Sequence, residues 1–192
     1  MEITFFTALL LLLVFSGLAI FDGLYLHILK YRLHEHDESK REHLMHLIRA
    51  VFFPFILFFL YVRTDTTSFW IGTAFVVFDL FILGADAYME GESRAFMGGL
   101  PRWEYILHLF VNGFHFAGVA VYFVARVRIN ADSVSIVSNF DGIFWYGAFM
   151  SVAAQMLPGA ILLALAHIFV AHPRTLTYWN KALSRFSCCL PA

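Results

Sequence analysis

The sequence predicts an all-α integral membrane protein, a bundle of five transmembrane helices with its N-terminus outside and its C-terminus inside the cytoplasm. Three observations predict it. The 192 residues are 60% hydrophobic, against roughly 45–50% for soluble domains, and their mean hydropathy is +0.73. Five apolar stretches are long enough to cross a bilayer, which takes about 20 residues. Lys and Arg are biased towards one set of connecting segments, which predicts the orientation.

The first span is expected at about 3–27. It carries no charged residue before Asp22, so its apolar run matches the thickness of the hydrocarbon layer. No basic leader precedes it and no small-residue cleavage motif follows it. We therefore expect a retained helix, not a cleaved signal peptide.

The second span is expected at about 44–62. Ser39 and Glu42 stand three residues apart before it, in the pattern of a capping box, where both side chains bond to amides at the start of the helix. Pro54 is expected to kink this span, because proline removes a backbone donor and its ring crowds the preceding turn.

The third and fourth spans are expected at about 69–89 and 103–124. Between them lies the stretch 91–101, in which Gly and Pro residues predict a turn. The fourth span is followed by a polar connecting stretch, 126–142.

The fifth span is expected at about 143–171, with an interruption at Pro158. The remaining segment, 173–192, has aromatic residues and leucine at helix-like spacing among basic residues, so we expect it to lie along the membrane interface. Cys188 and Cys189 are the only cysteines and are adjacent, which argues against a disulfide framework.

The distribution of basic residues predicts the orientation. The chain has 13 Lys and Arg residues, and all except Arg63, Arg126 and Arg128 fall on one side of the predicted membrane. That side is expected to be cytoplasmic, as in a bacterial-type inner (plasma) membrane. The net charge of −1, with no dominant basic face, argues against nucleic acid as a partner. The length allows a single domain, 1–192.

Ionisable residues within the spans fall mostly in the cytoplasmic half. A charge in hydrocarbon costs roughly 2.5–3.5 kcal/mol, so such residues are expected to be paired, metal-bound or in contact with water. The third and fourth spans each carry three of them within about 40° of one another, at 100° per residue. The candidate metal ligands are His46, Asp86, Glu90, Glu104, His108 and His115.

These residue types favour metal chemistry. Oxygen and nitrogen donors together favour iron, manganese or zinc over copper(I). Glu104 and His108 are four residues apart, which places both on one helical face, whereas the carboxylate sites of known bundles use a spacing of three. A metal here would polarise an oxygen or activate dioxygen or water. A spare carboxylate, Asp79 or Asp22, would then act as the catalytic acid or base.

The same residues are also compatible with a purely structural network of buried ion pairs. Arg49, one turn inside the second span, is the expected partner, because its guanidinium can bind Asp86 or Glu104 through two hydrogen bonds.

The other histidines are expected outside the site. His34 and His36 lie in a charged connecting segment and are expected on the solvated surface. His167 is expected in an interfacial or packing role. At 100° per residue, His27 is about 140° around the helix from Asp22, so these two are not expected to share a site.

The sequence therefore predicts a membrane metalloprotein with a buried His/carboxylate site near the cytoplasmic face. The expected activity is that of a metal-dependent oxidoreductase or hydrolase acting on a lipid-like or isoprenoid-like molecule from the membrane, and a homo-oligomer is compatible with the sequence. Two alternatives stay open. One is a proton or metal-ion translocator with an Asp/His relay. The other is a haem b electron carrier with axial histidines such as His46 and His108.

Overall fold

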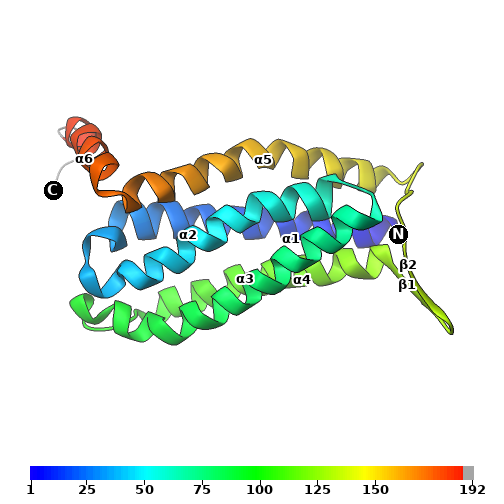
Figure 1. Ribbon diagram of the computed structural model, residues 1–192, viewed down its shortest axis with the longest axis horizontal. Coiled ribbons are helices and arrows are strands. Elements are labelled where there is room, and N and C mark those ends of the chain that lie inside the picture. The colour runs from blue at the N-terminus through cyan, green and yellow to red at the C-terminus, as the bar shows by residue number, and fades with distance from the viewer. Residues whose placement is uncertain (188–192) are drawn as a thin grey trace.

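A computed structural model describes residues 1–187, and the protein is 84% helical, which confirms the all-α prediction. Long helices run side by side between two opposite poles of the molecule (Figure 1). Two of them change from α-helical to π-helical hydrogen bonding partway along. The helices are α1 (Glu2–Ile20), continued by η1 (Phe21–Lys30); α2 (Lys40–Phe55), continued by η4 (Ile56–Val62); α3 (Thr66–Ser93); α4 (Arg102–Arg126); α5 (Phe144–Ala171); and α6 (Pro173–Ser187).

Five helical stretches within residues 1–187 are long and apolar enough to cross a membrane, the number that the sequence predicts. The first four extend beyond the predicted apolar spans at one or both ends, because helical hydrogen bonding continues past the last apolar residue, and the fifth matches its prediction to within one residue. The stretches are Glu2–Lys30, Asp37–Val62, Thr66–Met97, Arg102–Arg126 and Phe144–Ala171.

Short elements connect the long helices. The polar stretch after α4 forms a β-hairpin, in which β1 (Val127–Asn130) pairs antiparallel with β2 (Ser133–Ile136). The hairpin lies at the same pole as the N-terminus, and α6 lies at the opposite pole (Figure 1). The 3₁₀ turns are η2 (Leu33–Glu35), η3 (Asp37–Ser39) and η5 (Ala95–Met97).

Two local predictions need correction. The predicted interruption at Pro158 is absent, since α5 continues through this residue. Pro54, where a kink is expected, lies within α2 shortly before the change to π-helical bonding in η4. The predicted capping box is wrong: the Ser39 hydroxyl donates to the Ser93 carbonyl at 2.6 Å, so it bonds to α3 and not to its own helix. Cys188 and Cys189 lie outside the described residues.

The packing order of the helices determines where the bundle is closed. α1 packs against α4 and α5, and α2 packs against α3 and α5. At the N-terminal pole the core is aromatic: Tyr61, Tyr122 and Phe149 are buried, with ring centroids 4.9–5.3 Å apart. The buried ionisable residues of η1, α2 and α3 lie towards the opposite pole, where η1 leads into α2 and α3 leads into α4 (Figure 1).

Candidate functional site

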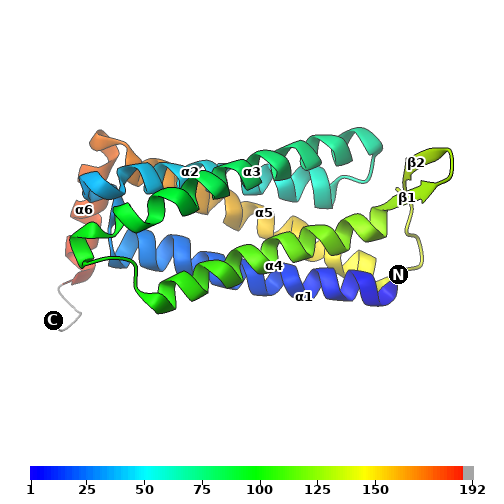
Figure 2. The same ribbon diagram turned by 90° about the horizontal axis from the view of Figure 1, so that it is seen from below.

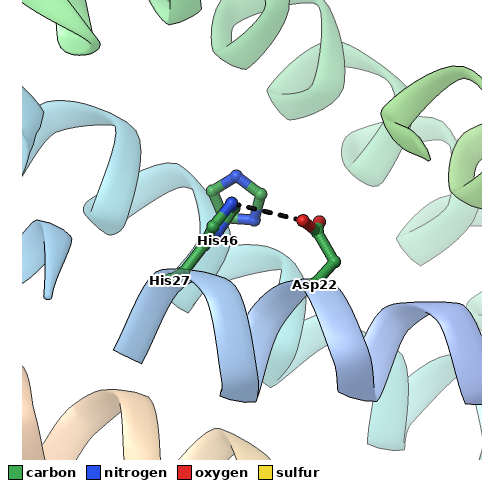
Figure 3. Close-up of side chains that lie close together, drawn as sticks. All are labelled: Asp22, His27 and His46. Carbon is green, nitrogen blue, oxygen red and sulfur yellow. Dashed lines mark ion pairs between the residues drawn. The ribbon is translucent and has the colours of Figure 1, made fainter. Parts of the chain in front are cut away.

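The segment η1 contributes Asp22 and His27 to the polar pole. The Nε2 atom of His27 lies 3.4 Å from Oδ1 of Asp22, although the two residues are five positions apart in the sequence. An α-helix would place them on different faces, but a π-helix bonds residues five apart and so stacks this spacing on one face. The prediction that they do not share a site is therefore wrong. Both side chains are buried, and both project from the same side of their helix (Figure 3).

Helix α2 contributes Glu42 and His46, four residues apart. The Nε2 atom of His46 lies 3.3 Å from Oδ2 of Asp86 and 3.7 Å from Oε1 of Glu42. The His46 ring also lies against that of His27, with centroids 4.1 Å apart and planes at 81° (Figure 3). His46 thus connects η1 with α3.

Helix α4 contributes Glu104 and His108, one turn apart. The His108 ring lies between two carboxylates: Nε2 is 3.0 Å from Oδ1 of Asp22, and Nδ1 contacts Oε1 of Glu90. Glu104 is fully buried. The fourth span therefore faces η1 on one side and the end of α3 on the other.

Arg94, at the end of α3, is fully buried at the centre of this pole. Its Nη1 donates to Oε2 of Glu42 at 2.5 Å, and its Nη2 donates to Oε1 of Glu104 at 2.6 Å. Nη2 is also 3.3 Å from Nε2 of His27. Of the two partners expected for Arg49, Glu104 is bound by Arg94, whereas Asp86 does pair with Arg49, whose Nη1 lies 4.0 Å from Oδ2 of Asp86. Arg94 stands among the basic residues of the predicted cytoplasmic side, and its burial is unexpected; the sequence signal for it is the excess of carboxylates in the apolar spans over a single arginine.

A second polar cluster lies deeper in the bundle. The Nε of Arg49 donates to Oδ1 of Asp79 at 3.0 Å, and its Nη2 donates to Oδ1 of Asn112 at 2.8 Å. The Nε2 atom of His115 is 3.4 Å from Oδ2 of Asp79. Asp79, predicted as a catalytic acid or base, is thus paired with an arginine and aligned with an imidazole.

Three groups of ligand atoms at the polar pole are compact enough to hold a metal ion. In each group, atoms from three residues lie within 4.8 Å of one another. His27 and His46 each belong to two groups, while the second and third groups have no residue in common. Searched over residues 1–187, the groups are Asp22, His27 and His46; His27, Glu104 and His108; and Glu42, His46 and Asp86.

The structure therefore gathers four of the six predicted ligands into these groups, namely His46, Asp86, Glu104 and His108. Glu90 contacts His108 but belongs to none of the groups. His115 also belongs to none and lies beside Asp79 instead. Asp22, predicted as catalytic, is brought into a candidate ligand group.

Several polar atoms at this pole are buried without a hydrogen-bond partner in the described part of the chain. They include one oxygen each of Glu42, Asp86 and Glu104, and Nδ1 of His27. Burying a polar group without a partner costs roughly 1–3 kcal/mol. Such atoms are free to bind a ligand.

The balance of charge at this pole also calls for a bound cation or additional protons. The carboxylates facing the site outnumber the nearby arginines, Arg49 and Arg94. Carboxylates in a low-dielectric interior need compensating cations or protons. The carboxylates in question are Asp22, Glu42, Asp79, Asp86 and Glu104, all buried, and the half-buried Glu90.

A cavity of about 530 Å³ connects the two polar clusters. At one end it is lined by ligand-group residues such as His46, Asp86 and His108. Its remaining walls are mainly apolar, with Phe15 and Phe53 among them. The volume falls within the range of sites for small organic ligands, about 300–1,000 Å³.

Three further histidines lie at this pole. His34, His43 and His167 are all buried, so the prediction of a surface His34 is wrong. His167 packs against His43, in line with the packing role expected for it, and it also lines the cavity. The rings of His43 and His167 stack, with centroids 5.3 Å apart. Burial lowers the pKa of His34. His36 is half-buried and stacks on Phe96.

Comparison of the chain with protein-family models, with curated proteins and with solved structures found no match.

Proposed function

We propose that the protein is an integral membrane metalloenzyme whose His/carboxylate centre lies near the cytoplasmic face and acts on a lipid-like or isoprenoid-like substrate. One observation carries this proposal: three overlapping ligand groups from different helices meet at the polar end of a largely apolar cavity.

The donor set supports a redox or Lewis-acid metal. Two of the groups combine two imidazoles with one carboxylate, the composition of non-haem iron sites with free coordination positions. The third has two carboxylates and one imidazole. Iron, manganese or zinc suits these donors. The metal would polarise a substrate oxygen or activate dioxygen or water.

The deeper cluster supports an acid–base role next to that metal. His115 and Asp79 both line the cavity. Asp79 is held by Arg49 and in turn lies against the imidazole of His115, an arrangement that orients a histidine for proton transfer. His115 is thus the acid or base, and Asp79 its positioning partner.

The basic residues support the orientation. Lys30, Lys40 and Arg102 lie at the pole that carries the site, whereas Arg63 and Arg128 lie at the opposite pole. The site pole is therefore cytoplasmic and the N-terminus external.

The alternatives have less support. A relay through the membrane would have to cross the aromatic core around Tyr122 and Phe149, which offers few groups that exchange protons. Axial ligation of haem by His46 and His108 would require room for a macrocycle between the two rings. Their centroids are 6.4 Å apart, but the ring of His27 lies 4.1 Å from that of His46 and 5.7 Å from that of His108, which leaves little room for the macrocycle.

The test is metal content. The purified protein, reconstituted with Fe²⁺, Mn²⁺ or Zn²⁺ and freed of excess metal, is expected to retain metal by elemental analysis and to lack a Soret band. The double variant His27→Ala/His46→Ala removes a ligand from all three groups and should retain none. The matched control His36→Ala/His172→Ala removes two histidines outside the groups and should retain it all. Wild-type protein without metal, or a folded His27→Gln/His46→Gln variant with unchanged metal, would overturn the proposal.

A further inference from the structure

We propose that the cavity opens sideways between α3 and α4 and admits the single apolar chain of a membrane lipid whose uncharged, oxygen-bearing head reaches the His/carboxylate end. The role given to the head of the lipid depends on the proposed function. The route itself rests on the packing of the helices.

The packing order leaves one side of the bundle open. α3 packs against α2 and η4, and α4 packs against α1. Both helices lie on the face of the molecule turned towards the viewer in Figure 2, α3 beside α2 and α4 beside α1. Both line the cavity, α3 through Leu83 and Ala87, and α4 through Tyr105, Leu109 and Gly113. The cavity thus reaches the seam between them.

Residues at this seam face the cavity and the outside at the same time. Tyr105 is 52% exposed and Leu109 is 56% exposed, although both line the cavity. Ala87 and Gly113 are exposed as well. A residue that borders both an internal cavity and the outer surface marks the rim of an opening. Because this rim lies within two helices apolar enough to cross a membrane, the opening faces hydrocarbon.

The seam is uncovered at Gly113. A Cβ atom built on Gly113 would meet no atom within 4 Å, so α3 does not approach α4 at this position. Gly84 on α3 is equally unobstructed, but it does not line the cavity. The two glycines therefore give a matched pair of positions for substitution: Gly113 at the opening and Gly84 beside it.

The lining defines the occupant. Apolar walls such as Phe53, Ile56 and Leu163 match a hydrocarbon chain, and the polar groups converge at one end. An amphiphile with one chain satisfies both parts at once. The excess of carboxylates over arginines disfavours an anionic head, whereas an uncharged oxygen is an acceptable ligand for the proposed metal.

Photolabelling tests the opening. The protein is placed in nanodiscs with a long-chain primary alcohol that carries a diazirine in its chain, irradiated and digested. Labels are expected on the cavity faces of α3 and α4, around Leu83–Ala87 and Leu109–Phe116, and unlabelled alcohol should compete for them. In Gly113→Leu, the added side chain fills the seam, and labelling of these peptides is expected to fall about tenfold, equivalent to about 1.4 kcal/mol. The control Gly84→Leu should label like the wild type.

Metal content in the same samples separates this inference from the proposed function. Gly113→Leu that retains its metal but loses the competed labels supports the lateral opening. Equal, competed labelling in Gly113→Leu and Gly84→Leu overturns it, as does wild-type labelling that unlabelled alcohol does not displace. Competed labelling of a wild-type protein that holds no metal supports the opening and overturns the proposed metal chemistry. A diazirine fatty acid that labels as strongly as the alcohol overturns the uncharged head.

Discussion

The guanidinium of Arg94 binds one carboxylate oxygen of Glu104 through two nitrogens, Nε at 3.1 Å and Nη2 at 2.6 Å, with neither side chain exposed. Its third nitrogen binds Glu42. Glu104 and Glu42 belong to two different candidate metal groups that have no common residue. Arg94 is thus a fixed cation that joins the two groups and orients one carboxylate of each.

Replacing Arg94 with alanine is expected to lower the free energy of unfolding by about 3–5 kcal/mol, because it leaves two buried carboxylates without their cation. The stability of Arg94→Lys should lie between that of the wild type and that of Arg94→Ala, since an ammonium supplies the charge but cannot reproduce the planar, multidentate geometry. Thermal unfolding in detergent measures both. Arg102→Ala, which removes an exposed arginine from the same pole, is the control. An Arg94→Ala protein as stable as this control would contradict the structural role.

The shared histidines predict a graded loss of metal. His27→Ala removes two of the three groups and leaves Glu42, His46 and Asp86, whereas His46→Ala leaves only the group on His27, Glu104 and His108. Because these two remaining groups have no common residue, the wild type can hold two ions and each single variant at most one. Elemental analysis after reconstitution measures the number of metal ions per protein molecule in each variant. Single variants that lose all metal would show that the groups act as one site.

The positions of several site residues could be predicted because they depend only on regular helical geometry. Glu104 and His108 lie four residues apart on an α-helix, and the structure places them on one face of α4 next to the same polar pole. The spans could be predicted from hydropathy for a similar reason, since each is a continuous apolar run. Helical periodicity and apolar length are local properties, and the sequence encodes both directly.

The rest depends on tertiary structure. The pairing of Asp22 with His27 requires π-helical bonding in η1, and the apolar pattern of this segment is the same for a π-helix as for an α-helix. Arg94 is buried because two carboxylates from other helices surround it, so its position in a polar turn gives no sign of burial. Ser39 has the local pattern of a helix cap but finds a better partner in α3.

The contact between Gly72 of α3 and Leu60 of η4 gives a stability test away from the site. A Cβ atom at Gly72 would lie 2.7 Å from the backbone nitrogen of Leu60 and 2.8 Å from its Cα, so the two helices would have to separate. Gly72→Ala is expected to destabilise the protein by about 1–3 kcal/mol, as overpacking does. Gly84→Ala meets no atom within 4 Å and should be neutral or slightly stabilising. Equal unfolding temperatures for Gly72→Ala and Gly84→Ala would contradict the close contact between Gly72 and Leu60.

His34 predicts how stability changes with pH. It lies in the connection between η1 and α2, and burial lowers its pKa from the ordinary 6.5, an effect that Arg32 and His36 increase and Glu35 opposes. The unfolded chain therefore binds a proton at a higher pH than the folded protein does. Stability is fully present above pH 6.5 and is lost as the pH falls through and below that value, because protonation then favours the unfolded state.

His34→Gln removes this titration and should make the unfolding temperature less sensitive to pH between about 7.5 and 5.5. His172→Gln, which replaces an exposed histidine at the same pole, keeps His34 intact and should retain the wild-type slope. The difference between the two slopes isolates the contribution of one buried imidazole from that of the other titrating groups. If the wild type and His34→Gln lose stability in parallel on acidification, His34 binds its proton equally well in the folded and unfolded states, and its burial in the connection has no energetic consequence.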